Sequence, residues 1–319
     1  MELTSTGHRI MPDIVIKKSV IDQEPINKKA HRILTDCVRI ELPVLPRQVR
    51  TLLAMAGDSD LSMADMAYIV LSDPCMSINF LRIGNSAFYA PGKQRVIQMQ
   101  NILVLLGLDN IVSTLLSFPQ ITTSGPQELN KTNPVLAGYL SRSAIQMKIA
   151  MDICSHIGLE SQILPVCLAC SDLGMLVLSI TQPHISRFLW TLMKRDSVMK
   201  RTAKKVIGRT PVQLGLEIAR HWNLPMTTRR TIALVGGINQ KDAGLIEGLA
   251  LHIHGWIMSA ALDNSERQTF HLEMLRAKTG FKYMFFSNLI KESLQSFARD
   301  SVYFYQVLEL QGLFRNLMV

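Results

Sequence analysis

The chain has 319 residues, of which 48% are hydrophobic and 18% charged, and its net charge is +9. These values are typical of a folded protein and exclude an intrinsically disordered chain. The length accommodates two modest domains, or one domain with an extension. Aromatic residues are sparse, at 6%, and the 17 methionines favour a helical core. The positive charge permits an acidic partner, such as nucleic acid, a nucleotide or an acidic protein surface.

Five cysteines, an odd number in a chain of this size, indicate reduced thiols in a cytosolic protein. We expect no signal peptide, because no apolar stretch follows the basic residues near the N-terminus. The most apolar run, 163–180, is interrupted by Pro165, Ser171 and Asp172. A buried helix of a protein core explains this run better than a membrane span. The sequence therefore predicts a cytoplasmic protein.

Helical periodicity, with start and stop residues, recurs along most of the chain. Residues 1–27 lack it and are predicted to form a flexible or loosely docked arm. The predicted helices span 28–40, 47–55, 62–71, 74–87, 98–106, 109–117, 134–157, 163–180, a short segment from 183, then 211–222, 227–234, 243–262, 266–278, 283–297 and 301–317. A polar linker is predicted at 122–131. No alternating strand pattern is present, so the predicted fold class is all-α.

The stretch from Ser62 to Gly107 has the clearest local signals. Ser62 and Asp65 have the spacing of a capping box, and Asp73 is placed to cap a helix whose first residue is Pro74. This apolar helix ends in the polar sequence Gly84-Asn85-Ser86. Two interpretations of the ending stand side by side. Asn85 fixes the next turn through backbone hydrogen bonds, or Asn85 and Ser86 line a recognition cleft between two halves of the core.

Several short motifs follow one another in a consistent order between about residues 36 and 237. They are Leu42-Pro43-Val44-Leu45-Pro46, Ser72-Asp73-Pro74, Leu81-Arg82-Ile83-Gly84-Asn85-Ser86-Ala87, Leu105-Leu106-Gly107, Asp172-Leu173-Gly174, Leu214-Gly215 and Trp222-Asn223-Leu224-Pro225. In this combination the chain resembles the HDOD family, a branch of the HD-domain phosphohydrolase superfamily. The resemblance implies a regulatory module in bacterial signalling, without a defined activity. We expect an HDOD-like helical domain at 28–237 and a C-terminal helical extension at 238–319.

Related HD-type hydrolases bind metals through histidines and an adjacent His-Asp pair, which activate water for phosphoester cleavage. The resemblance places the matching positions at Arg142, Ser171, Asp172, Pro211 and Val235–Gly236, so only Asp172 keeps its type. A lone carboxylate beside an arginine cannot assemble a divalent metal site. We therefore expect no catalytic residue, no metal and no cofactor, and we interpret Asp172 as a buried or half-buried group paired with Arg142.

Other groups with metal or redox chemistry are interpreted as structural. His252 and His254 are two residues apart in a predicted helix, so their side chains point to different sides. Cys167 and Cys170 form a Cys-x-x-Cys inside an apolar segment, with no second pair and no preceding strand. A glycine-rich phosphate loop is also missing.

Residues 194–209 contain seven cations and one acid. The run is either a solvated helix face or an anion-binding patch that includes Lys200, Arg201, Lys204 and Lys205. The run lacks aromatic residues for base stacking, which disfavours binding of single-stranded nucleic acid. No helix-turn-helix signature is evident, which disfavours sequence-specific binding of DNA.

The sequence predicts a non-catalytic regulatory protein that acts through protein–protein interaction in a bacterial signalling pathway, one that the family resemblance links to cyclic dinucleotides. Two alternatives stay open. One is a divergent metal-dependent phosphohydrolase that uses unmatched residues. The other is a nucleic-acid or cyclic-dinucleotide-binding regulator that uses the basic segment 194–209. The candidate binding residues are Asn85, Ser86, Lys200, Arg201, Lys204 and Lys205.

Overall fold

The computed structural model describes residues 25–57, 62–90, 92, 95–122, 125–160, 162–238, 243–301, 304 and 306. Within these ranges the chain forms seventeen α-helices and no strand, so the all-α prediction is confirmed. One isolated parallel bridge pairs Val44 with Gln120. The predicted arm at 1–27 and the predicted helix at 301–317 lie almost entirely outside the described residues.

The helices follow one another with short connections. They are α1 (Ile26–Arg39), α2 (Pro46–Ala56), α3 (Met63–Val70), α4 (Pro74–Gly84), α5 (Met99–Leu106), α6 (Leu108–Ser117), α7 (Pro126–Thr132), α8 (Pro134–Ile157), α9 (Ile163–Ala169), α10 (Leu173–Thr181), α11 (Pro183–Thr191), α12 (Asp196–Ile207), α13 (Pro211–His221), α14 (Met226–Val235), α15 (Leu245–Ala261), α16 (Ser265–Thr279) and α17 (Tyr283–Asp300).

The predicted caps are confirmed. Ser62 and Asp65 form a capping box at α3, and the Asp73 side chain accepts a hydrogen bond from the Met76 amide at 3.1 Å. Asn133 accepts one from the Leu136 amide at the same distance. These bonds satisfy amides that have no partner in the first turn of a helix. Local sequence therefore sets where these helices begin.

Two predicted segments are wrong. The linker at 122–131 contains the short helix α7, which begins at Pro126. The apolar run 163–180 is not one helix but two, α9 and α10, which meet at a bend of 44°. At the break the Ser171 hydroxyl donates to the Leu168 carbonyl oxygen at 2.8 Å. A side chain that competes for backbone groups in this way favours a turn over a continuous helix.

The described part of the chain contains no single helix that is both long enough and apolar enough to cross a membrane. Two neighbouring pairs, α5 with α6 and α9 with α10, meet the length and composition only when each pair is taken together, and they bend by 102° and 44°.

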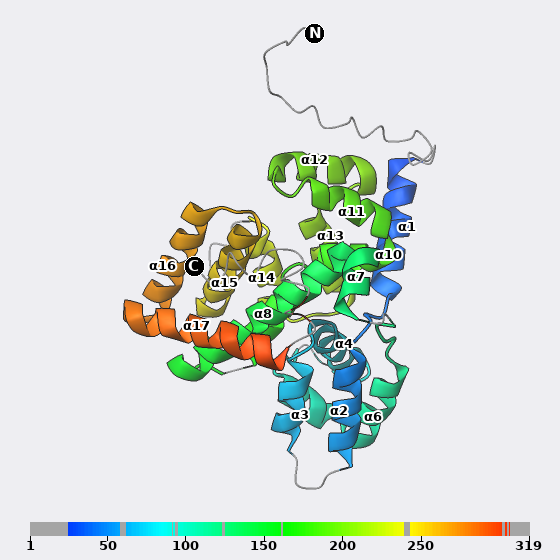
Figure 1. Cartoon of the computed structure of the whole chain (residues 1–319). Coiled ribbons are helices and arrows are strands. Elements are labelled where there is room, and N and C mark those ends of the chain that lie inside the picture. The colour runs from blue at the N-terminus through cyan, green and yellow to red at the C-terminus, as the bar shows by residue number, and fades with distance from the viewer. Residues whose placement is uncertain are drawn as a thin grey trace.

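Helix α8 lies at the centre of the molecule, with α9, α10, α11, α15 and α17 packed around it (Figure 1). Of its 24 residues, 17 are buried. A helix that is buried on all sides carries apolar residues on all sides, so the few polar residues inside it need a reason. Three of them, Tyr139, Arg142 and Gln146, follow at helical spacings of three and four and lie on one face.

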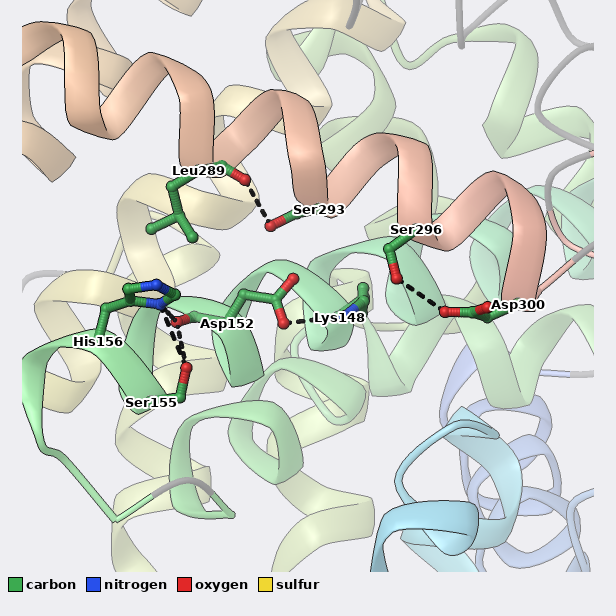
Figure 2. Close-up of polar contacts among 8 residues, drawn as sticks. All are labelled: Lys148, Asp152, Ser155, His156, Leu289, Ser293, Ser296 and Asp300. Atoms are coloured by element: carbon green, nitrogen blue, oxygen red, sulfur yellow. Dashed lines mark hydrogen bonds and ion pairs between the residues drawn. The ribbon is translucent and has the colours of Figure 1, made fainter.

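The C-terminal helices share the core of the preceding helices. One continuous cluster of buried apolar residues runs from Ile33 to Phe304. Helix α17 crosses α8, and the hydrogen bonds and ion pairs drawn in Figure 2 stay within each helix, as between Lys148 and Asp152. Leu289 and Phe297 of α17 are buried, and the Phe285 ring of α17 lies 5.6 Å from the His156 ring of α8. The segment after 237 is an integral part of the packing.

Helices α10 and α13 touch through their backbones. A Cβ atom added at Gly174 would lie 1.9 Å from the Pro211 carbonyl oxygen and 2.8 Å from the Gly215 nitrogen. A Cβ at Gly215 would lie 2.9 Å from the Gly174 nitrogen. Backbone atoms cannot give way as a flexible side chain can, so glycine is required at both positions. Both glycines belong to the motifs that carry the resemblance.

We expect Gly174→Ala to lower the free energy of unfolding by about 3 kcal/mol or more, because the methyl group forces α10 and α13 apart. Urea titration followed by circular dichroism measures this loss. Gly57→Ala is the matched control, because a Cβ there meets its nearest atom at 3.6 Å. Equal stabilities of the two variants would contradict the close approach of the backbones.

Candidate functional site

Four of the six positions that match the HD-type metal ligands line one cavity. Its volume is about 380 Å³, and Asp172, Pro211, Val235 and Gly236 all line it. They come from the starts of α10 and α13 and the end of α14. Arg142 of α8 stacks against Tyr139, which is another lining residue. The structure thus brings together positions that lie almost 100 residues apart in the sequence.

Arg142 is the largest polar group in this region, and its side chain is only 1% exposed. The guanidinium carbon lies 4.5 Å from the ring centroids of both Tyr139 and Trp190. Cation–π contacts of this kind stabilise a guanidinium away from water. Burial lowers the pKa of Arg142, opposed by the nearby Tyr139 and Asp172. Its Nε and Nη2 atoms have no hydrogen-bond partner.

Asp172 lies beside a histidine and forms no ion pair with Arg142, so the expected direct pairing is wrong. The Asp172 Oδ2 atom lies 3.8 Å from Nδ1 of His254, and it has no hydrogen-bond partner. His254 Nδ1 is also 3.4 Å from the Ser171 hydroxyl and 3.4 Å from Oε1 of Gln146. Burial lowers the pKa of His254, and Asp172 opposes that shift. Burial thus favours the neutral form of this imidazole, which belongs to a buried polar cluster.

Sequence reasoning missed His254 and Gln146 as members of this site. His254 lies on α15, beyond the motifs that carry the resemblance, so no motif pointed to it. For Gln146 a signal existed, since Tyr139, Arg142 and Gln146 share one face of an otherwise apolar helix. The prediction that His252 and His254 point to different sides is confirmed. The Nδ1 atom of His252 lies 3.1 Å from Nδ1 of His271 on α16.

The side chains around the cavity do not fit a divalent metal. Four Asp and His side chains line the cavity, but only Asp172 and His254 lie close to each other, 3.8 Å apart, whereas Asp196 pairs with Lys200 and His271 lies beside His252. The buried guanidinium of Arg142 adds a positive charge that repels a cation. Among the residues that the structure describes, no group of three or more His, Cys, Asp or Glu side chains could hold a metal ion. Divalent metal sites in proteins need at least three such ligands or several waters and carboxylates.

Cys167 and Cys170 are buried, free thiols. Burial raises the pKa of Cys167 to about 12 and that of Cys170 well above its usual value. Because the thiolate is the reactive form, both side chains have the properties of small apolar core residues.

Asn85 is the C-cap residue of α4, which ends at Gly84, before the predicted end at 87. Its side chain is fully buried. The amide nitrogen donates to the carbonyl oxygens of Leu81 and Val96, and the amide oxygen accepts from the Val96 nitrogen at 2.9 Å. Both ends of the side-chain amide are thus bonded to the backbone, as expected if Asn85 fixes the turn that follows α4. A binding role for the half-exposed Ser86 stays a prediction.

The basic segment forms α12 and is partly neutralised. Lys200 pairs with Asp196 at 2.8 Å and also lines the cavity, whereas Lys194 pairs with Asp263. Arg209 pairs with Glu217 of α13. The other three candidate residues, Arg201, Lys204 and Lys205, are exposed. Lys200 therefore belongs to the cavity, whereas Arg201, Lys204 and Lys205 lie on the exposed surface.

Together the fold and the site define a class: an all-helical domain around a buried central helix, with an arginine-containing cavity where relatives of the HD type would bind metal. A family model described as HDOD domain matches residues 42–236, more than half of the chain. The chain belongs to the HDOD domain family. The match ends before α15, so His254 lies outside it.

Two solved structures share the fold. The MmoQ response regulator from Methylococcus capsulatus str. Bath is 18% identical, with a TM-score of 0.59, over 79% of this chain and 98% of that chain. A virulence factor from Campylobacter jejuni subsp. jejuni is also 18% identical, with a TM-score of 0.60, over 85% and 99%. Such identities show the fold alone. No curated protein matches the chain.

Proposed function

We propose that the chain is a non-catalytic regulatory module of a bacterial signalling pathway and acts in the cytoplasm by binding a protein partner. Membership of the HDOD family and the fold shared with a protein described as a response regulator support the signalling role. The observation that carries the proposal is an exposed apolar surface at the elbow between α5 and α6.

This surface, here called the elbow patch, consists of Val104, Leu105 and Leu108. Their exposed fractions are 61%, 41% and 40%, and Gly107 joins the two helices between them. Large apolar side chains gathered at one place on a surface are typical of protein–protein contact sites. The elbow lies within the residues that match the family model.

The non-catalytic part of the proposal rests on the cavity, where no three of the described His, Cys, Asp or Glu side chains are grouped to hold a metal and the buried Arg142 lies behind the wall. We expect the purified full chain to contain substoichiometric Fe, Mn, Zn and Ni by elemental analysis, and to leave phosphodiester substrates uncleaved. Stoichiometric metal that is lost in Asp172→Asn and His254→Gln would contradict the proposal and establish a divergent phosphohydrolase.

The partner surface is tested by replacing Leu105 and Leu108 together with serine. Affinity capture from the native host, followed by mass spectrometry, should recover a protein with the wild-type chain, and the double variant should bind that protein at least tenfold more weakly. Met226→Ser with Ile238→Ser is the control, because these side chains are exposed elsewhere. Equal capture by both double variants would exclude the elbow patch as the partner site.

A second candidate function is polyanion binding by a basic surface on α1 and α12. These helices pack against each other, and each contains four cations and one acid, a net charge of +3 each. Lys28 of α1 is exposed, like Arg201, Lys204 and Lys205 of α12. Two adjacent cationic helices concentrate the charge that a nucleic-acid backbone would bind.

The slope of log K against log salt concentration is negative for nucleic-acid binding. If nucleic acid binds there, reversing Arg201, Lys204 and Lys205 to glutamate should reduce the magnitude of this slope by about three, one for each lost phosphate contact. Fluorescence anisotropy with labelled DNA and RNA measures this slope. Lys131, Arg187 and Lys291 are exposed cations on other helices, and their reversal is the charge-matched control. Identical slopes for both triple variants would identify the basic face as solvated surface.

A further inference from the structure

The cavity beside Arg142 is enclosed by both parts of the chain. Its walls come from α8, α10 and α12–α14, which lie in the family match, and from α15 and α16, which lie beyond it. The second group supplies His254, Arg267 and His271. A volume of about 380 Å³ lies in the range of small-molecule pockets. The C-terminal extension therefore completes a site of ligand size.

Four helices begin at this cavity. The lining residues include the N-cap residue Asp172 of α10, the first residue Asp196 of α12, the first residue Pro211 of α13 and the N-cap residue Asn264 of α16. The start of a helix carries a partial positive charge and free backbone amides, which favour an anion. Two helices, α14 and α15, end there with the opposite polarity. The helix ends as a set favour a negative ligand.

Unpartnered donors lie next to the lining residues. Arg142, beside Tyr139, leaves Nε and Nη2 without a partner, and Gln146, beside His254, leaves Nε2 without one. Both side chains are at most 1% exposed. An unpaired buried donor is unfavourable, and more so when it is charged. The positive charge of Arg142 behind the cavity wall favours a negative ligand over a neutral one.

The charges around the cavity also favour an anion. The lining carries two cations, Lys200 and Arg267, and two acids, Asp172 and Asp196, and one of the acids already pairs with Lys200 at 2.8 Å. Arg142, which stacks on Tyr139 behind the cavity wall, adds a third positive charge. The remaining wall is apolar and rich in methionine, with Met175, Met193, Met199 and Met258. Methionine side chains adapt to the shape of an apolar ligand.

We propose that this cavity binds a small organic anion. A phosphate or carboxylate head lies by the helix starts and Arg142, and an apolar body lies against the methionines. The inference is independent of the elbow patch, so a protein partner and a small ligand can be tested separately. Arg142 then has a ligand-directed role in the place where relatives would bind metal.

Isothermal titration of the full chain with three probes tests the proposal. Adenosine 5′-monophosphate has a phosphate head and a ring, 4-phenylbutyrate has a carboxylate head and a ring, and adenosine is neutral. We expect at least one of the two anions to bind at least tenfold more tightly than adenosine, and the preferred anion identifies the head group. Failure of both anions to bind at about 5 mM, a ΔG° near −3 kcal/mol, would overturn the proposal.

Variants locate the binding. Arg267→Gln changes an exposed residue at the cavity, so the fold should tolerate it, and it should weaken anion binding about fivefold or more, as expected for one charge-assisted hydrogen bond. Asp172→Asn should strengthen binding by removing a repelling charge. Arg187→Gln, an exposed residue on α11 outside the cavity, is the control and should change nothing. Equal affinities of Arg267→Gln and Arg187→Gln would overturn the site, and weaker binding by Asp172→Asn would overturn the anionic class.

Discussion

The architecture depends on the contact between the backbones of α10 and α13. Because Gly174 and Gly215 lack side chains, the start of α10 lies against the start of α13, and Asp172 comes to the same cavity as Pro211. Any larger residue at either position would separate the two helices and open the cavity. The glycines of the family motifs thus have a geometric cause that holds whether or not a metal is bound.

Local signals predicted most of the helices, whereas tertiary contacts decided the rest. Asp73 and Asn133 cap their helices because the capping bond spans only three residues. The break between α9 and α10 depends on Ser171, whose competition with the backbone leaves only a weak mark on an apolar run. For the site, the resemblance gave Arg142 and Asp172. It could not give His254, which joins the cavity from 82 residues beyond Asp172 through packing of α15 against α8 and α9.

The state of Arg142 shows how a positive charge can be held in a protein core. Tyr139 and Trp190 cover it with two aromatic faces, which replace part of its hydration. Lysine could not use this slot equally well, because a planar guanidinium stacks on rings and an ammonium does not. The arrangement still leaves the Nε and Nη2 atoms unpaired. Native proteins pair more than nine in ten buried polar groups, so these two atoms are an exception.

The Asp73 helix, α4, holds the fold together, whereas the cavity carries the chemistry of the site. The motifs of α4 can therefore be present even though the metal-ligand positions at the cavity are not. On α4, Asp73 binds the Leu45 amide at 2.7 Å, and Asn79 binds both the amide and the carbonyl oxygen of Leu42. These bonds tie the 42–46 motif to the core, and Asn85 ties down Val96. None of these side chains lines the cavity. Substitutions at cavity positions can therefore alter the chemistry of the site without removing these contacts of α4.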